Sequence, residues 1–118
     1  MATIDHVLAV VAVSDLEAGR RWYAALLGRE PDNEPMATLA EWQVTPQGWL
    51  QVFVDPDRAG SSLFNLAVDD LEVYLAEVAG RGLEPQAVVD ADKGVRLSTL
   101  TDPDGNLIRL IGGFRVHY

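Results

Sequence analysis

The stretch Asp102-Pro103-Asp104-Gly105-Asn106-Leu107-Ile108-Arg109-Leu110 contains a turn followed by a strand. Asp-Pro-Asp-Gly is typical of a type I turn, because Asp accepts backbone hydrogen bonds, Pro presets φ and Gly tolerates the exit conformation. We expect one strand, residues 97–100, to enter this turn and another, residues 107–111, to leave it. The end of the chain is therefore predicted to be a hairpin.

Arg109 is the unusual residue of this hairpin. Side chains alternate along a strand, so Arg109 shares a face with the aliphatic residues Leu107 and Ile111. An arginine that points into a concave face is costly unless it is paired. Arg109 is therefore a candidate to bind a ligand carboxylate or phosphate with its planar guanidinium. The structural alternative is an ion pair with Glu41 or with an acid from a partner chain.

Composition limits the function classes. The chain has 118 residues, 48% hydrophobic and 23% charged, which is typical of one globular domain. It has no Cys, so disulfides, thiolate zinc sites and Cys nucleophiles are excluded. The net charge of −9 opposes nucleic-acid binding and favours cationic ligands. The longest apolar run, Val7 to Val13, is too short to cross a membrane, and no signal segment opens the chain, so we expect a cytoplasmic protein.

A repeated pattern divides the chain. A strand at 4–13 precedes a helix that starts at Ser14-Asp15-Leu16-Glu17, a capping-box pattern, and ends at Gly28. The same pattern returns with a strand at 63–68 and a helix that starts at Asp69-Asp70-Leu71-Glu72. The intervening segments are predicted to be a loop at 31–35, strands at 38–44 and 49–54, a turn at 45–48 and a linker at 55–62. We expect two units, about 1–56 and 60–114, which share one core and form a single domain, 1–118.

Several motifs carry a family resemblance. Asp15-Leu16, Trp22-Tyr23 and Leu26-Leu27-Gly28, followed by the repeat and by Asp102-Pro103-Asp104-Gly105-Asn106, resemble the vicinal oxygen chelate superfamily. This superfamily includes glyoxalase I, bleomycin-resistance proteins, fosfomycin-resistance enzymes and extradiol dioxygenases, and the resemblance covers essentially the whole chain. It implies an α+β fold in which two βαβββ modules form a cup-shaped, mixed-sheet half-barrel around the ligand. It also implies a homodimer.

The resemblance assigns four positions to the divalent metal that many members hold. In this chain those positions are Leu8, Gln51, Leu63 and Arg109. Two of the four are apolar, and Arg109 has no lone pair and repels a cation. We therefore expect no metal and no other cofactor. His6, two residues before Leu8, is a weak substitute ligand, and we interpret it as a residue at the rim of the cup.

Other residues are candidates for ligand contacts. Trp49, Gln51 and Phe53 alternate along one strand and are predicted to share the cup face, and Trp42 in the preceding strand is a candidate third aromatic. Aromatic side chains suit a flat or cationic organic ligand, although they are also ordinary core residues. Trp22 and Tyr23 are interpreted as core or dimer contacts.

The leading hypothesis is a metal-independent small-molecule binding protein of the glyoxalase/bleomycin-resistance type, with Leu8 and Leu63 also in its cup. Its predicted partner is an aromatic or zwitterionic ligand, with no nucleic acid and no membrane. The alternative is a glyoxalase-like lyase or isomerase that uses Glu41, His6 or Arg109 in place of a metal. No serine-histidine motif, phosphate loop or dinucleotide fingerprint is present.

Overall fold

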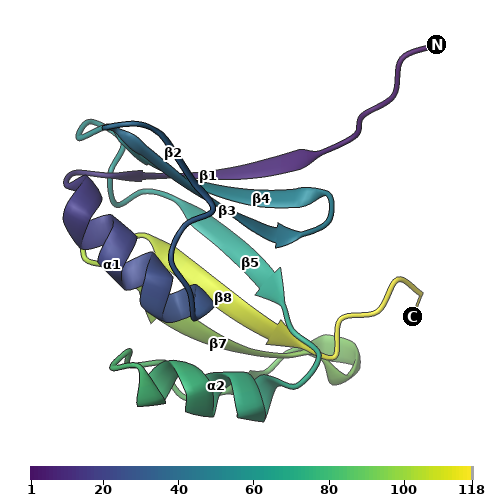
Figure 1. The fold of residues 1–118 in the computed structure, drawn as a ribbon. Coiled ribbons are helices and arrows are strands. Elements are labelled where there is room, and N and C mark those ends of the chain that lie inside the picture. The colour runs from purple at the N-terminus through teal and green to yellow at the C-terminus, as the bar shows by residue number, and fades with distance from the viewer. Residues whose placement is uncertain (118) are drawn as a thin grey trace.

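Two units of the same build follow each other along the chain (Figure 1). The structure is a computed structural model, and it describes residues 1–117. The first unit consists of β1 (Val7–Val13), α1 (Leu16–Leu27), β2 (Asn33–Met36), β3 (Leu39–Thr45) and β4 (Gly48–Val54). The second consists of β5 (Leu63–Ala67), α2 (Leu71–Gly80), β6 (Val89–Asp90), the short 3-10 helix η1 (Asp92–Gly94), β7 (Arg96–Thr101) and β8 (Leu107–Gly112). The predicted α+β fold of two βαβββ modules is confirmed.

Each unit forms its own four-stranded mixed sheet. The strand order is β1-β4-β3-β2 in the first sheet and β5-β8-β7-β6 in the second. The first and last strands of each unit, β1 with β4 and β5 with β8, pair in parallel, and the other neighbours are antiparallel. The parallel pairs require a crossover, which α1 and α2 provide. Both sheets are open, and β1 and β5 each form a free edge.

The helix starts lie one residue later than the capping boxes predicted. Asp15, not Ser14, is the N-cap of α1, and its carboxylate accepts a hydrogen bond from Glu17 N at 3.1 Å. Asp70 caps α2 in the same way through Val73 N. Ser14 instead donates from its backbone N and its hydroxyl to the Asp104 carboxylate, at 3.0 and 2.5 Å. A contact with a residue 90 positions away therefore replaces the predicted local cap.

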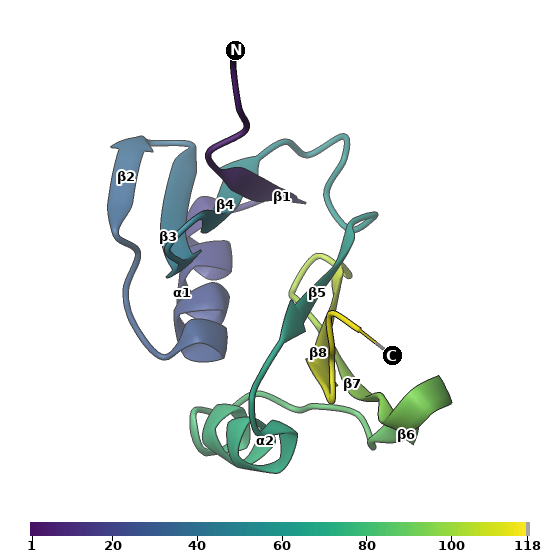
Figure 2. The same cartoon turned by 90° about the vertical axis from the view of Figure 1, so that its right-hand side faces the viewer.

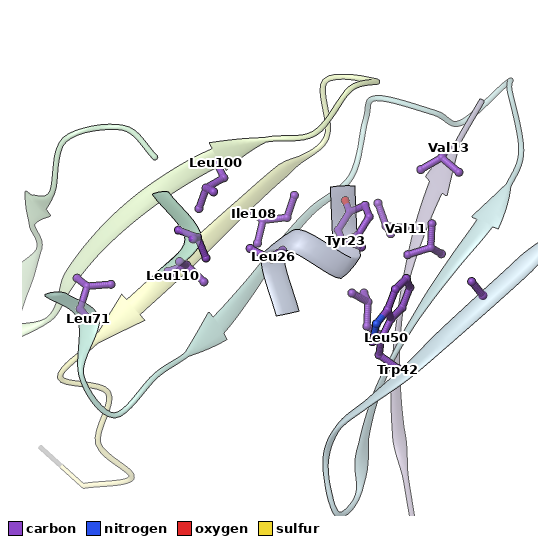
Figure 3. Close-up of a cluster of buried hydrophobic side chains, with 13 residues drawn as sticks. Val11, Val13, Tyr23, Leu26, Trp42, Leu50, Leu71, Leu100, Ile108 and Leu110 are labelled. Atoms are coloured by element: carbon purple, nitrogen blue, oxygen red, sulfur yellow. The ribbon is translucent and has the colours of Figure 1, made fainter. Parts of the chain in front are cut away.

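Both sheets bury one face in a single core that lies between them (Figure 3). In the first sheet these residues include Val11, Val13, Trp42, Leu50 and Val52. In the second they include Leu100, Ile108 and Leu110. Helix α1 lies between the two sheets in the view of Figure 2, and α2 covers the second sheet. One face of each sheet is thus buried against the helices, and the other face is left open.

Tyr23 of α1 connects the two units within this core. Its side chain is fully buried and its ring stacks on Phe64 of β5, with ring centroids 6.4 Å apart. Its hydroxyl donates a 2.8 Å hydrogen bond to the Asp102 carboxylate. Burial first, and the nearby Asp102 charge second, raise the pKa of the Tyr23 phenol far above its ordinary value. Tyr23 is therefore a core residue, whereas its neighbour Trp22 is half-buried.

The turn from Asp102 to Asn106 joins the two units. Gly105 N donates to Asp102 O at 3.1 Å and Gly105 has φ +99°, as the predicted turn requires. Asn106 is fully buried: its Nδ2 donates to Ala12 O at the end of β1 at 2.8 Å, and its Oδ1 accepts from Gly60 N and Ser62 N in the linker. One turn in the second unit thus binds the first strand of the first unit and the chain that connects them.

The segment 31–35 was predicted to be a loop, and this prediction is wrong. Residues Asn33–Met36 form β2, which pairs antiparallel with β3 at the sheet edge. Pro35 has no N–H to donate, and an edge strand tolerates this because one side of it needs no partner. The strand is irregular, since its register shifts between Asn33 and Met36.

Candidate functional site

The open faces of the two sheets contain most of the predicted site residues. In the first sheet the parallel register pairs Leu8 with Trp49, Val10 with Gln51 and Ala12 with Phe53. Paired residues share a face, and alternation places this face opposite the buried Val11, Leu50 and Val52. Trp49, Gln51 and Phe53 are half-buried, and 52% of Leu8 is exposed. The first sheet therefore presents an aromatic and aliphatic face with one amide at its centre.

The second sheet repeats this arrangement with different chemistry. Its parallel register pairs Leu63 with Leu107 and Asn65 with Arg109. Gln51 and Arg109 thus occupy equivalent places in the two units. Leu8 and Leu63 are also equivalent, because each lies two residues before the partner of Gln51 or Arg109 in the parallel register. Leu63 is 49% exposed and Leu107 is 37% exposed. The predicted alternation along the last strand agrees with the burial pattern, since Leu107, Arg109 and Ile111 are exposed or half-buried and Ile108 and Leu110 are buried.

Gln51 is part of a polar row across the first sheet. Its Nε2 donates to Glu41 Oε2 at 2.9 Å, and Asn33 Nδ2 donates to the other oxygen, Glu41 Oε1, at 3.1 Å. These side chains come from β4, β3 and β2, and Glu41 lies opposite Gln51 in the strand register. We call Asn33, Glu41 and Gln51 the acidic row.

Arg109 is part of the equivalent row in the second sheet. Its Nε donates to Asn65 Oδ1 at 2.8 Å, and Thr99 of β7 lies beside it in the register. Within residues 1–117 no carboxylate lies within ion-pair distance of Arg109. The predicted structural alternative of an ion pair with Glu41 is therefore not found, since the Glu41 oxygens are bound by amides. We call Asn65, Thr99 and Arg109 the basic row.

Trp42 does not join the open face, and that prediction is wrong. Trp42 is fully buried in the core, where its Nε1 donates to Arg29 O at 2.9 Å. The cause is a β-bulge at Val44. Thr45 pairs with Gly48 at the turn, but the next pair is Gln43 with Trp49, so the register slips by one residue. A slip of one residue moves every side chain of a strand to the other face.

His6 lies outside the sheet. The first strand begins at Val7 rather than at residue 4, and His6 belongs to the extended segment before it. Its Nδ1 is 3.3 Å from Asp5 Oδ1, and 46% of its side chain is exposed. Within residues 1–117 no ion pair joins it to a residue of either row, so its interpretation as a rim residue stays a prediction.

The four positions that the family resemblance assigns to a metal do not form a donor set here. Leu8 and Leu63 offer no lone pair and the Arg109 guanidinium is a cation, so the Gln51 carbonyl oxygen is the one donor among the four positions. Nowhere in residues 1–117 do three His, Cys, Asp or Glu side chains gather at metal-binding spacing. The residues present do not fit a divalent ion at this place.

Four surface clefts stand out, and none is lined by Trp49, Gln51, Phe53 or Arg109. One cleft, of about 410 Å³, lies between the two sheets and is lined in part by Asn65 and Ala67 of β5, the strand that also contains Leu63. Apart from Asn65, no residue of either row lines one of these clefts.

The comparisons with known proteins agree with this architecture. The sequence profile of a family described as "Glyoxalase-like domain" matches residues 8–111, which include both units. The chain belongs to the glyoxalase-like domain family. A search of curated proteins finds no match.

Solved structures place this glyoxalase-like chain beside binding proteins and enzymes of the same fold. A glyoxalase/bleomycin resistance protein from Catenulispora acidiphila DSM 44928 is 36% identical, with a TM-score of 0.85 over 91% of this chain and 96% of that one. TnmS3, an antibiotic binding protein from Streptomyces sp. CB03234, is 24% identical, with a TM-score of 0.78 over 95% and 98%. A bleomycin-binding protein complexed with bleomycin is 22% identical, with a TM-score of 0.77 over 93% and 99%. The resemblance to the vicinal oxygen chelate superfamily is confirmed.

The glyoxalase-like chain has, within its described residues, no helix long and apolar enough to cross a membrane.

Proposed function

We propose that this protein is a metal-independent small-molecule binding protein of the glyoxalase/bleomycin-resistance type, which holds an organic ligand on the open faces of its sheets. Relatives named for antibiotic and bleomycin binding share its fold, which supports a binding role. The lack of fit between a metal ion and Leu8, Leu63 and Arg109 supports metal independence.

The observation that carries the proposal is the environment of Arg109. Its hydrogen-bond partner is the neutral, exposed Asn65 side chain, and its aliphatic neighbours Leu63 and Leu107 are exposed rather than buried. The terminal guanidinium nitrogens remain available for a bidentate contact with a carboxylate or phosphate. The proposed ligand is partly apolar and carries an anionic group, with Trp49 and Phe53 available for its flat surface.

We further propose that the protein acts as a homodimer. Leu8, Val10, Leu63 and Leu107 are between 37% and 52% exposed on the open faces of one chain. Apolar surface on two open sheet faces favours a covering partner, and a two-fold homodimer is the commonest closed assembly. A second copy over these faces would also enclose the rows that the single chain leaves open.

The test uses one ring with three substituents: naphthalene-2-carboxylate, 2-(hydroxymethyl)naphthalene and 2-(aminomethyl)naphthalene. Binding is measured by amide chemical-shift perturbation in ¹⁵N NMR titrations at pH 7.5. The carboxylate should bind at least about tenfold more tightly than the neutral alcohol, as a charge-assisted hydrogen bond predicts. Arg109→Leu should remove this preference, and Arg58→Leu, a substitution at an exposed arginine paired with Asp55, should retain it.

Arg109→Leu should also change the free energy of unfolding by less than about 1 kcal/mol, because it leaves only the exposed Asn65 amide without its partner. A loss of about 3–5 kcal/mol in urea denaturation would indicate instead that Arg109 anchors a buried ion pair. Failure of all three naphthalenes to bind would contradict the binding proposal. Turnover of thiol adducts, epoxides or catechols would favour the lyase or isomerase alternative.

A further inference from the structure

The acidic row, Asn33, Glu41 and Gln51, has a charge that nothing in the described chain balances. Every one of the other six glutamates is exposed, whereas Glu41 is half-buried. Its two oxygens accept one hydrogen bond each, from Asn33 Nδ2 and from Gln51 Nε2. Both donors are neutral amides, and no Lys, Arg or His of residues 1–117 makes an ion pair with Glu41.

Nine other carboxylates of residues 1–117 also lack an ion pair, but Glu41 is the one that lies half-buried on an open sheet face. Arg20, Arg21, Arg29, Arg58 and Arg96 each make an ion pair with at least one carboxylate. The two half-buried charges on the open faces, Glu41 and Arg109, are instead held by amide side chains. They occupy rows that are equivalent in the two units, because Glu41 pairs with Gln51 as Thr99 pairs with Arg109.

The hydrogen bonds also fix what the acidic row can offer. A carboxylate has about four acceptor positions, so Glu41 keeps capacity after its two amide bonds. Gln51 uses its NH₂ group toward Glu41, which leaves its carbonyl Oε1 as an acceptor. Trp49 and Phe53 lie two residues on either side of Gln51 on the same strand face, and aromatic rings attract cations. The row therefore presents acceptors and π-faces, which suit a group that has several N–H donors and a positive charge.

We infer that the acidic row is a second ligand subsite, which binds an ammonium or amidinium group. This inference rests on the proposed binding function and adds a cationic group to the anionic one assigned to Arg109. The basic row is then a subsite for an anionic group, and the acidic row is a subsite for a cationic group.

The test uses the aminomethyl member of the same naphthalene series, which is a cation at pH 7.5. It should bind the unmodified protein at least about tenfold more tightly than the hydroxymethyl compound, with chemical-shift changes centred on residues 33–36, 39–45 and 48–54. Glu41→Gln, which keeps the size and an acceptor oxygen, should remove this preference. Glu77→Gln, at an exposed position of α2, should retain it.

The two charged probes separate the inference from the proposed function. Glu41→Gln should retain the preference for naphthalene-2-carboxylate over the neutral alcohol, and Arg109→Leu should retain the preference for the amine over that alcohol. If the carboxylate binds through Arg109 but the amine binds no better than the alcohol, the acidic subsite is refuted and the binding function stands. If the amine preference survives in Glu41→Gln, the inference is also refuted. Retention of the native amide spectrum in Glu41→Gln checks that the variant is folded.

Discussion

The buried phenol of Tyr23 makes the stability of the protein depend on alkaline pH. Its pKa is raised by burial and by Asp102, whereas an unfolded tyrosine titrates near pH 10. Above about pH 10 the unfolded chain loses this proton and the folded chain keeps it, so the unfolded state is favoured as pH rises. The Tyr23 contribution to stability is therefore complete below pH 10 and declines above it.

We expect this single group to lower the free energy of unfolding by about 1.4 kcal/mol for each pH unit above 10. Tyr74, whose pKa burial also raises, adds to the total slope, so the comparison must be made between variants. Tyr23→Phe should remove the Tyr23 contribution to the pH dependence of the unfolding free energy. Tyr74→Phe should remove only the Tyr74 contribution. Urea denaturation between pH 9 and 11 measures both. Equal slopes for Tyr23→Phe and the unmodified protein would contradict the assignment.

Among the elements, the turn from Asp102 to Asn106 has the most demanding environment. Asn106 is fully buried and binds four groups: Ala12 O, the Asp102 carboxylate, Gly60 N and Ser62 N. Asn106→Ala would remove the side-chain partner of Ala12 O, Gly60 N and Ser62 N, whereas Asp102 would keep its bond from Tyr23, and each buried unsatisfied polar group costs about 1–3 kcal/mol.

We therefore expect Asn106→Ala to lower the free energy of unfolding by at least about 3 kcal/mol, because several partners lose their hydrogen bonds together. Asn65→Ala is the matched control: Asn65 is exposed and binds only Arg109, so the loss should stay below about 1 kcal/mol. Chemical denaturation of both variants makes the comparison. Similar losses for the two would mean that the turn does not join the units.

The hairpin sequence predicted this turn and the alternation of the last strand, because both depend on neighbours in the chain. It did not predict what the turn binds. The partners of Asp102 and Asn106, Tyr23 and Ala12, lie 79 and 94 residues away. No local pattern contains that information. The sequence signal that could have drawn attention to Asn106 is its place directly after the turn, where a short side chain can reach another backbone.

The acidic row and Trp42 show the same limit within one sheet. A regular hairpin around residues 45–48 would pair Val44 with Trp49 and place Trp42 beside Gln51 on the open face. The bulge at Val44 shifts the register by one, so Glu41 takes that place and Trp42 enters the core. A bulge depends on how the strand packs, and the residues at 43–45 carry no sequence signal for it. β2 was missed for a related reason, since Asn33 and Pro35 are typical of loops.

At the scale of the whole molecule, the open faces predict assembly. The chain has a mass of 12.9 kDa, and we expect light scattering at micromolar concentration to give about twice that value. Val10→Glu and Leu63→Glu place charges on the exposed apolar faces and should shift the species toward the monomer. Val73→Glu, at an exposed apolar position of α2, is the control and should leave the mass unchanged. A 12.9 kDa species for the unmodified protein would contradict the dimer.

The contacts of Asn106 have a further consequence for the continuity of the chain. These hydrogen bonds join the second unit to the end of β1 independently of the peptide bonds in the linker. Arg58 in that linker is exposed. A protease that cuts after Arg58 should therefore produce two fragments that stay folded and migrate together in gel filtration, and that separate only on a denaturing gel. Two genes that encode residues 1–58 and 59–118 should complement each other when they are expressed together. The covalent connection would then ensure that the two units are produced in equal amounts, and it would not be needed for their association.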